Sequence, residues 1–349
     1  MNVDDLRLID ANANRAREGI RTAEDYIRFK VSDSRWAARL KAIRHSISEQ
    51  LGSVFSSESL CSARNVSSDP LKPSQEEGNR DAVSENSKAV AHRGLKRAQE
   101  ALRVLEEYLR GSFPKISAEF SLSRYALYET EQWLLNASDA AQIIDASTVY
   151  VLLTGSLCKS GLMKTAEATL KGGARLIQLR EKEDTGKELL KQARDLQSMC
   201  RTYGAVLICN DRLDVSLAAG AAGVHLGQSD LPPADVRRIA GEKLLIGRST
   251  HSVEQARQAV KVDQADYIAI GSMYETSTKA GRILVGLKLA EEIAEQNLPV
   301  PVFAIGGIKL EKVKELKAAG VRRIAVSTAV IADADPESAT RKLIEAMAS

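Results

Sequence analysis

Apolar residues are spaced differently in the two parts of this chain. From the N-terminus to about Leu135 they recur every three or four positions, with almost no alternating or β-branched runs, which predicts an all-α region. From Tyr150 onward, short β-type runs alternate with helix-compatible segments. The change of pattern predicts an all-helical accessory domain over 1–140 and a second domain over 148–349, joined by the polar stretch 136–147.

The second part contains eight apolar runs of strand length, each followed by a segment that can form a helix. We expect strands at Val149–Thr154, Arg175–Leu179, Val206–Asn210, Gly223–Leu226, Leu244–Gly247, Tyr267–Ile270, Val302–Ile305 and Arg323–Val326. Eight βα units in about 200 residues fit a compact (β/α)8 TIM barrel, which makes the fold class α/β. A doubly wound sheet is the alternative, although it usually has fewer strands and a Gly-rich first turn.

The helical part contains an internal repeat. Residues 15–28 and 97–110 are identical at seven of fourteen positions, and each forms one apolar helical stripe. The shared charged residues, among them Arg21 and Arg103, lie off that stripe. They either form solvated faces with ion pairs along each helix or line a duplicated polar pocket between the two helices. The Ser-, Asn-, Asp- and Pro-rich stretch 62–87 predicts a long loop between the repeats.

Composition narrows the function classes. The chain has 349 residues, a formal net charge of +3, 44% hydrophobic and 27% charged residues, which is ordinary for a globular protein and gives no sign of nucleic-acid binding. No apolar run approaches the roughly 20 residues that span a bilayer, and the acidic N-terminus is unlike a signal peptide. The four cysteines form no CxxC pair, so neither a disulfide framework nor a zinc site is indicated. We expect a cytoplasmic protein that acts on small molecules, with homo-oligomerisation left open.

The segment Gln178-Leu-Arg-Glu-Lys182 follows the second expected strand. Side chains alternate between the faces of a strand, so Gln178, Arg180 and Lys182 are expected to point the same way. In a parallel barrel the active site forms at the C-terminal ends of the strands. An amide and two cations at such an end predict a site for an anion such as a diphosphate.

Two aspartates follow the third and fourth strands. Asp211 and Asp230 supply hard oxygen ligands, and Mg²⁺ is typically held by one or two carboxylates together with water and substrate phosphate. With Arg180, Lys182 and Lys279 they would form a metal and cation clamp for a diphosphate. The competing interpretation of each aspartate is a helix N-cap.

The later strands end in groups suited to a second phosphate. Hydroxyl groups lie at 276–278, and Gly306 and Gly307 permit close approach of a ligand to the backbone. The loops after strands 7 and 8 are a frequent phosphate site in such barrels. We expect His225 to be a packed, hydrogen-bonded core residue and His251 to support the site indirectly, since no Ser-His-Asp order is present.

The barrel part, from about Tyr150 to Ala348, resembles thiamine-phosphate synthase. The motifs that carry the resemblance are QLREK (178–182), ND (210–211), GVHLGQSD (223–230), GRSTH (247–251), TSTK (276–279) and IGGI (305–308). The resemblance implies a transferase of thiamine biosynthesis that joins 4-amino-5-hydroxymethyl-2-methylpyrimidine diphosphate to hydroxyethylthiazole phosphate with release of pyrophosphate. It also implies a Mg²⁺-assisted dissociative mechanism, in which pyrophosphate leaves before the thiazole nitrogen attacks.

The resemblance implies a role for each matching residue. The catalytic cations are Arg180, Lys182 and Lys279, and the metal ligands are Asp211 and Asp230. The expected substrate-binding residues are Gln178, Leu179, Glu181, Asn210 and Ser249 on the pyrimidine side, and Thr276, Ser277, Thr278, Gly307, Ser327 and Thr328 on the thiazole phosphate side. A shift of one position would place Val326 where we expect Ser327.

The sequence departs from the family pattern after the sixth strand. Gly271-Ser272 stands where the family usually has Gly-Pro, and Glu275 stands where a proline precedes the first threonine. These changes bear on loop stiffness and on charge near the phosphate, hence on substrate affinity. The alternatives are a thiazole tautomerase-like barrel, which does not use the diphosphate, and a ligand-sensing regulatory protein.

The helical part resembles a domain that is fused ahead of this synthase in some bacteria. The motifs are ANANRAREG (11–19) and RAQEALRVLEEY (97–108), and the resemblance implies either a pyrimidine-phosphate kinase or a regulatory module. The part contains no P-loop or other nucleotide signature. Its activity, the oligomeric state and transfer between the two sites do not follow from the sequence.

Overall fold

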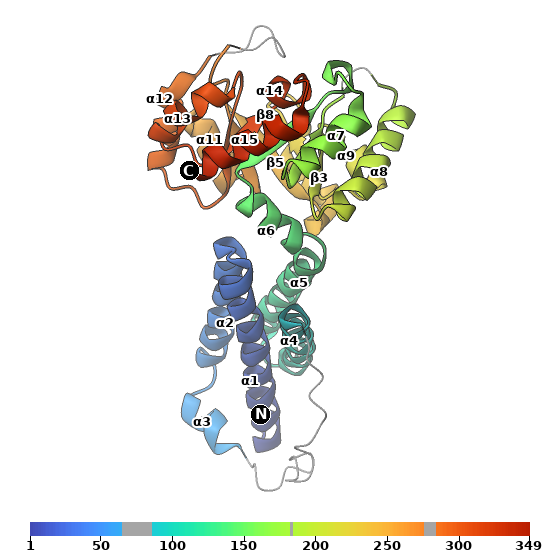
Figure 1. Cartoon of the computed structure of the whole chain (residues 1–349). Helices are drawn as coiled ribbons and strands as arrows, with labels where there is room; N and C mark the ends of the chain where they lie inside the picture. The colour runs from blue at the N-terminus through green and yellow to red at the C-terminus, as the bar shows by residue number, and fades with distance from the viewer. Residues whose placement is uncertain (65–85, 182–183, 276–283) are drawn as a thin grey trace. The chain divides into compact units, whose positions relative to one another are not determined.

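The computed structural model describes residues 1–64, 86–181, 184–275 and 284–349. The chain divides into two compact units, Met1–Leu135 and Asn136–Ser349 (Figure 1). The first unit is helical throughout its described residues, and the second contains a closed parallel barrel. None of the described helices is both long and apolar enough to cross a bilayer.

The described residues of the first unit form four long helices and two short helical segments. Their bounds are α1 Val3–Tyr26, η1 Ile27–Val31, α2 Ser34–Gly52, α3 Ser57–Ser62, α4 Ser87–Leu109 and α5 Pro114–Asn136. Side chains that precede helices accept backbone N–H groups, as Asn2 does in a capping box with Asp5, and as Asp33 does from the N–H of Trp36. Trp36 of α2 stacks on Trp133 of α5 at 4.9 Å between ring centroids, so these two helices share a core.

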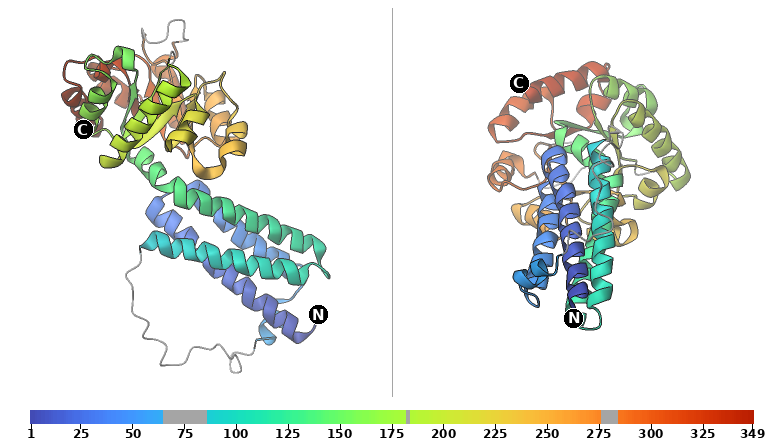
Figure 2. Two further views of the ribbon diagram at one scale, coloured as in Figure 1. Left: turned by 90° about the vertical axis from the view of Figure 1, so that its right-hand side faces the viewer. Right: turned by 90° about the horizontal axis from the view of Figure 1, so that it is seen from below.

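The two repeats lie on α1 and α4, which run antiparallel along one another (Figure 2). The predicted apolar stripe of the first repeat, Ala16 to Ile27, is fully buried. The helices touch where Gly19 meets Gly94, because a Cβ on either glycine would overlap the carbonyl oxygen of the other. Glycine at these two positions therefore sets the separation of the helices.

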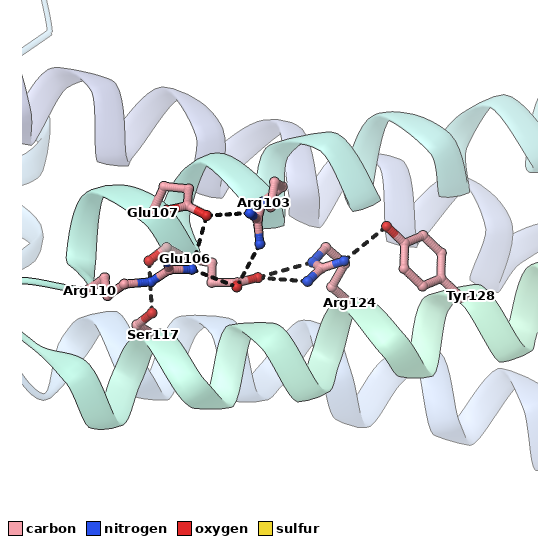
Figure 3. A network of polar contacts seen from close by, with 7 residues as sticks. All are labelled: Arg103, Glu106, Glu107, Arg110, Ser117, Arg124 and Tyr128. Atoms are coloured by element: carbon pink, nitrogen blue, oxygen red, sulfur yellow. Dashed lines mark hydrogen bonds and ion pairs between the residues drawn. The ribbon is translucent and has the colours of Figure 1, made fainter.

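Each repeat carries a buried glutamate that pairs with an arginine of the next helix. Glu24 accepts from Arg44 Nε at 2.9 Å, and Glu106 accepts from Arg124 Nε at 3.1 Å and Nη2 at 2.9 Å. Figure 3 shows the second cluster, in which Arg103 and Arg110 also reach Glu106. The sequence left open solvated faces with ion pairs along each helix or a polar pocket between the helices. Ion pairs along the helix are present, and those of Arg103 and Arg110 converge on the buried carboxylate of Glu106.

A separate polar contact joins α4 to α5. The carboxylate of Glu131 is hydrogen-bonded to Lys96, Gln99 and His92 at 2.7–3.1 Å. Partial burial would raise the pKa of Glu131, but the three hydrogen bonds outweigh it and lower the pKa. The ionised carboxylate therefore contributes to holding the two helices together.

The second unit confirms the predicted (β/α)8 barrel. Its strands are β1 Val149–Leu153, β2 Leu176–Leu179, β3 Val206–Asn210, β4 Gly223–Leu226, β5 Leu245–Thr250, β6 Tyr267–Ile270, β7 Val302–Ile305 and β8 Ile324–Val326. They pair in parallel in the order β1 to β8, and β8 closes on β1. The one sizeable difference from the sequence prediction is β5, which runs on to Thr250 and so includes Ser249.

Helices cover the outside of the barrel (Figure 1). The described helical segments are α6 Ser138–Ala146, η3 Gly155–Leu157, α7 Leu162–Lys171, α8 Gly186–Thr202, α9 Leu213–Ala219, α10 Pro233–Ala240, η4 Gly241–Lys243, α11 Val253–Lys261, α12 Gly286–Glu295, η5 Leu310–Lys312, α13 Val313–Ala318, α14 Thr328–Ile331 and α15 Pro336–Ala348. Helix α6 occupies most of the stretch that the sequence suggested as a polar junction. Its sequence contains apolar Ile143 and Ile144, and Ile144 is buried.

The strands divide the core into an outer and an inner part. Alternate residues such as Val151 and Ile177 pack outward in the cluster shared with the helices. Inside the barrel, the rings of Tyr150, Tyr267 and Phe303 contact one another with centroids 5.4–5.9 Å apart. This aromatic cluster fills the interior and leaves a cavity toward the C-terminal ends of the strands.

Candidate active site

A pocket of about 840 Å³, open solvent at its mouth included, lies at the C-terminal ends of the strands. The described residues that line it are Tyr150, Leu152, Gln178, Arg180, Asn210, His225, Ser249, Ala269, Ser272, Ile305, Gly306, Gly307, Ile308, Ala325, Val326, Ser327 and Thr328. Seven predicted site residues therefore share one cavity, namely Gln178, Arg180, Asn210, Ser249, Gly307, Ser327 and Thr328.

Strand β2 and the residues after it alternate as predicted. Gln178 and Arg180 line the pocket, whereas Leu179 packs in the outer hydrophobic core and does not. The carboxylate of Glu181 accepts the backbone N–H of Gly155, in the segment after β1. The side chains of Leu179 and Glu181 thus support the position of this strand end, and their expected substrate contact stays a prediction. Lys182 lies outside the described residues.

Arg180 is the cation of the described pocket. Arg180 is only 7% exposed and lines the pocket. Its guanidinium has no hydrogen-bond acceptor among the residues that the structure describes. Desolvation lowers the pKa of Arg180, against the attraction of nearby Asp211 and Glu181. Buried charges are normally paired. A buried guanidinium that faces a pocket without an acceptor is therefore prepared for an anionic ligand.

Asp211 and Asp230 lie at the ends of neighbouring strands. The N–H of Asp211 donates to the carbonyl of His225 at 2.9 Å, and Asp211 adopts a left-handed φ of 61°, a conformation that Asp tolerates better than most residues. Asp230 Oδ2 accepts the N–H of Gly227 at 2.6 Å. A hydrogen bond therefore holds the backbone of Asp211 directly after β3, and another holds the side chain of Asp230 in the segment that follows β4.

The donor set fits a magnesium ion that is shared with substrate. Among the described residues no group of three or more His, Cys, Asp or Glu side chains could hold a metal, so these residues offer carboxylates at most in ones or twos. Mg²⁺ commonly accepts one or two carboxylates and fills its other positions with water and phosphate oxygens. The oxygen ligands of Asp211 and Asp230 match this chemistry better than they match zinc.

Backbone groups dominate the side of the pocket near β7 and β8. Gly306 and Gly307 have φ values of 106° and 63°, and a Cβ on Gly306 would overlap Ser272 Oγ. The hydroxyl oxygen of Ser327 is buried without a hydrogen-bond partner among the described residues. Both Val326 and Ser327 line the pocket. A narrow glycine backbone beside an unsatisfied hydroxyl is suited to a phosphate group.

The segment after β6 is only partly described. Thr276, Ser277, Thr278 and Lys279 lie outside the described residues, so their predicted roles stay predictions. Glu275, which precedes them, is exposed.

Sequence reasoning missed a row of polar side chains inside the barrel. Gln178 Nε2 donates to Tyr150 Oη at 2.6 Å, and the two tyrosine hydroxyls, of Tyr150 and Tyr267, are 3.0 Å apart. His225 Nδ1 lies 3.1 Å from Tyr267 Oη, and His225 Nε2 lies 2.9 Å from Ser249 Oγ. His225 is thus a packed, hydrogen-bonded residue, as predicted. The tyrosines were not recognised because they lie within apolar runs that read as core.

Comparison with known proteins gives a consistent result for both units. The family model described as "Thiamine monophosphate synthase" matches residues 149–330, and the model described as "ThiD2 family" matches residues 7–133. A protein of Thermosynechococcus vestitus named "Thiamine-phosphate synthase" is 38% identical over 340 residues, which cover 97% of this chain and 93% of that protein. A protein of Synechocystis with the same name is 37% identical over 341 residues, which cover 97% of this chain and 95% of that protein.

A solved structure matches the barrel unit. The structure titled "Thiamine phosphate pyrophosphorylase from Pyrococcus furiosus" is 33% identical, with a TM-score of 0.54, and the match covers 59% of this chain and 98% of that one.

Proposed function

This chain belongs to the thiamine-phosphate synthase family and catalyses the condensation that forms thiamine phosphate, and on that premise we propose which of its residues carry the reaction. The substrates are 4-amino-5-hydroxymethyl-2-methylpyrimidine diphosphate and hydroxyethylthiazole phosphate. Arg180 binds the diphosphate, while Gln178, Asn210 and Ser249 hold the pyrimidine. The single observation that carries this assignment is the buried guanidinium of Arg180, which faces the pocket without an acceptor among the described residues.

The reaction is dissociative. The bond between the pyrimidine methylene carbon and the diphosphate oxygen breaks first, pyrophosphate takes the electron pair, and the thiazole nitrogen then attacks the methylene cation. Such a step needs stabilisation of leaving-group charge and alignment of two substrates more than it needs a general base. Arg180 supplies this stabilisation together with Lys182 and Lys279, two cations that the sequence places at the same strand ends.

The metal site of the proposal consists of Asp211 and Asp230. When bound, Mg²⁺ would neutralise part of the diphosphate charge. Replacement of Asp230 by asparagine keeps an acceptor for the N–H of Gly227 while removing the anionic ligand, so it should raise the Mg²⁺ concentration needed for half-maximal rate. An unchanged Mg²⁺ requirement in both Asp211→Asn and Asp230→Asn would remove these residues from the metal site.

The thiazole phosphate binds against the backbone of Gly306 and Gly307, with hydroxyl donors from Ser327 and Thr328. The support for this is the unsatisfied Ser327 hydroxyl and the absence of room for a side chain at Gly306. The four residues lie on the same wall of the pocket, at the ends of β7 and β8.

Pyrophosphate release tests the function directly. The proposal expects Mg²⁺-dependent release from the two substrates together and from neither alone. Release from the diphosphate alone would point to hydrolysis, and no release under any condition would favour a tautomerase-like or sensing protein. In single turnover, Arg180→Ala should slow pyrophosphate departure, and an unchanged rate would refute its role.

For the helical unit, we propose that it phosphorylates hydroxymethylpyrimidine phosphate and so supplies the diphosphate to the barrel. Its support is the match to the family fused with this synthase. The full chain, given ATP, hydroxymethylpyrimidine phosphate and thiazole phosphate, should then form thiamine phosphate, and Arg180→Ala should still consume ATP. If ATP is not consumed, the unit is a regulatory module instead. Because all these substrates are phosphorylated and cross membranes poorly, we place the enzyme in the cytoplasm.

A further inference from the structure

Five side chains from five strands form one hydrogen-bonded row through the barrel, called here the relay. In order they are Gln178 of β2, Tyr150 of β1, Tyr267 of β6, His225 of β4 and Ser249 of β5, with heavy-atom distances of 2.6, 3.0, 3.1 and 2.9 Å. Both end residues line the pocket. The relay therefore connects two points of the substrate site through the interior of the protein.

One direction of the relay bonds lets every buried donor in it find an acceptor. Tyr150 Oη accepts from Gln178 Nε2, and because a buried hydroxyl hydrogen needs an acceptor, we assign the Tyr150 hydrogen to Tyr267 Oη, its other neighbour in the relay. The hydrogen of Tyr267 then goes to His225 Nδ1, which must be unprotonated. His225 carries its proton on Nε2 and donates to Ser249 Oγ.

This direction leaves a defined pair of groups at the pocket. Gln178 lines the pocket, and its buried Oε1 has no hydrogen-bond partner among the described residues, so this oxygen is the acceptor that a ligand packed against Gln178 would meet. At the other end, the hydroxyl hydrogen of Ser249 remains available as a donor. A reversed Gln178 amide would reverse each bond in turn and exchange the acceptor for a donor. The orientation of Gln178 is thus coupled to the tautomer of His225.

The surroundings favour an intact relay. Tyr150 and Tyr267 are fully buried, and desolvation raises the pKa of both hydroxyls, so they keep the protons that the relay needs. Gly247 of β5 leaves room for the central members, because a Cβ there would overlap the Tyr267 ring and His225 Nδ1. The tyrosine hydroxyls therefore stay neutral, and the close packing beside Gly247 holds the relay in one geometry.

We propose that Tyr150, Tyr267 and His225 are positioning residues that fix the Gln178 amide and thereby select an amino-substituted over an oxo-substituted pyrimidine. This inference rests on the proposed pyrimidine site. An exocyclic amino group donates to Gln178 Oε1, and a ring nitrogen accepts from Ser249. An oxo group would set one acceptor against another unless the whole relay reversed. Buried polar groups left without partners are a strong source of discrimination between close analogues.

The test compares two ligands in wild type and Tyr267→Phe. One is the amino diphosphate substrate, and the other is its oxo analogue, used as a competitive inhibitor of pyrophosphate release. Tyr267→Phe keeps the ring but cuts the relay, so Gln178 can turn independently. We expect the preference for the amino ligand to fall roughly tenfold or more. An equal weakening of both ligands, or an unchanged preference, overturns the proposal.

Phe303→Leu is the matched control, because Phe303 contacts the rings of both tyrosines and takes no part in the relay. Its preference should equal that of wild type. A second measurement needs no variant of the relay: ¹⁵N NMR of the full chain should show His225 neutral, with the proton on Nε2. A proton on Nδ1 overturns the assigned direction. If wild type releases no pyrophosphate from the amino substrate, the proposed function fails, whereas retained release with an unchanged preference removes the relay alone.

Discussion

Replacing Arg180 with methionine should stabilise the protein while removing its activity. Arg180 is buried without a hydrogen-bond acceptor among the described residues, and desolvation lowers the pKa of its guanidinium. The folded protein without ligand therefore bears part of the cost of a buried charge, which the bound diphosphate would offset. Methionine is also long and unbranched, and it carries no charge that must be desolvated.

The size of both effects can be bounded. Replacement of buried ionic groups by apolar residues of similar volume commonly gains about 1–4 kcal/mol. Nearby Asp211 and Glu181 compensate part of the cost, so we expect a gain of about 1 kcal/mol, which raises Tm by about 2–4 °C in a domain of this size. We expect two charge-assisted hydrogen bonds from the Arg180 guanidinium to the bound diphosphate. Their loss, at about 1.5–3 kcal/mol each, should lower kcat/KM by roughly 10²–10⁴-fold.

Thermal unfolding of the full chain without ligands, together with pyrophosphate release, measures both effects. Arg237→Met is the matched control, because the side chain of Arg237 of α10 is only 15% exposed but is paired with Asp266 at 2.6 Å and Glu242 at 3.1 Å. That variant should lose about 3–5 kcal/mol, since it leaves carboxylates without a partner. If Arg180→Met loses more than about 1 kcal/mol, or keeps the wild-type rate, the argument from the unpartnered guanidinium is wrong.

Three further predictions concern other parts of the chain. Glu106→Ala leaves buried Arg124 without its counterion and should cost about 3–5 kcal/mol in denaturant unfolding, whereas exposed Glu107→Ala should cost less than 1 kcal/mol; equal costs would contradict the buried pair. Gly306→Ala should weaken thiazole phosphate binding and stability together, while Gly161→Ala, which has a positive φ but open space, should cost only about 1 kcal/mol of stability. The pKa of Glu131 is lowered on folding, so its contribution to stability is present above its unfolded pKa and is lost as the pH falls through the folded value. Glu131→Gln should therefore flatten the fall in Tm below about pH 4.5, and an unchanged acid profile would refute this.

The sequence predicted the fold well because a parallel barrel repeats a simple pattern. Four of the eight strands match to the residue, since buried strands read as short apolar runs with polar residues at their ends. Strand β5 was cut short because Arg248, Ser249 and Thr250 are polar, although Thr250 is buried there. A polar residue therefore predicts the end of a barrel strand only where its side chain would find no hydrogen-bond partner inside the barrel.

The sequence predicted a site residue where the side chain alone indicates its chemistry. It did not predict residues whose role depends on hydrogen bonds to residues far away in the sequence. Arg180 could be placed from strand alternation alone. Leu179 and Glu181 belong to the same motif yet contact the outer core and Gly155. The link from Tyr150 to Tyr267 spans 117 positions and depends on barrel closure, so no local pattern announces it.

The antiparallel pairing of α1 with α4 gives the helical unit an internal symmetry. The repeat maps α1 onto α4 and Glu24 onto Glu106, each with an arginine from the following helix, so the two hairpins are related by an approximate two-fold axis. A contact across such an axis is isologous and can equally be made by two copies of one hairpin.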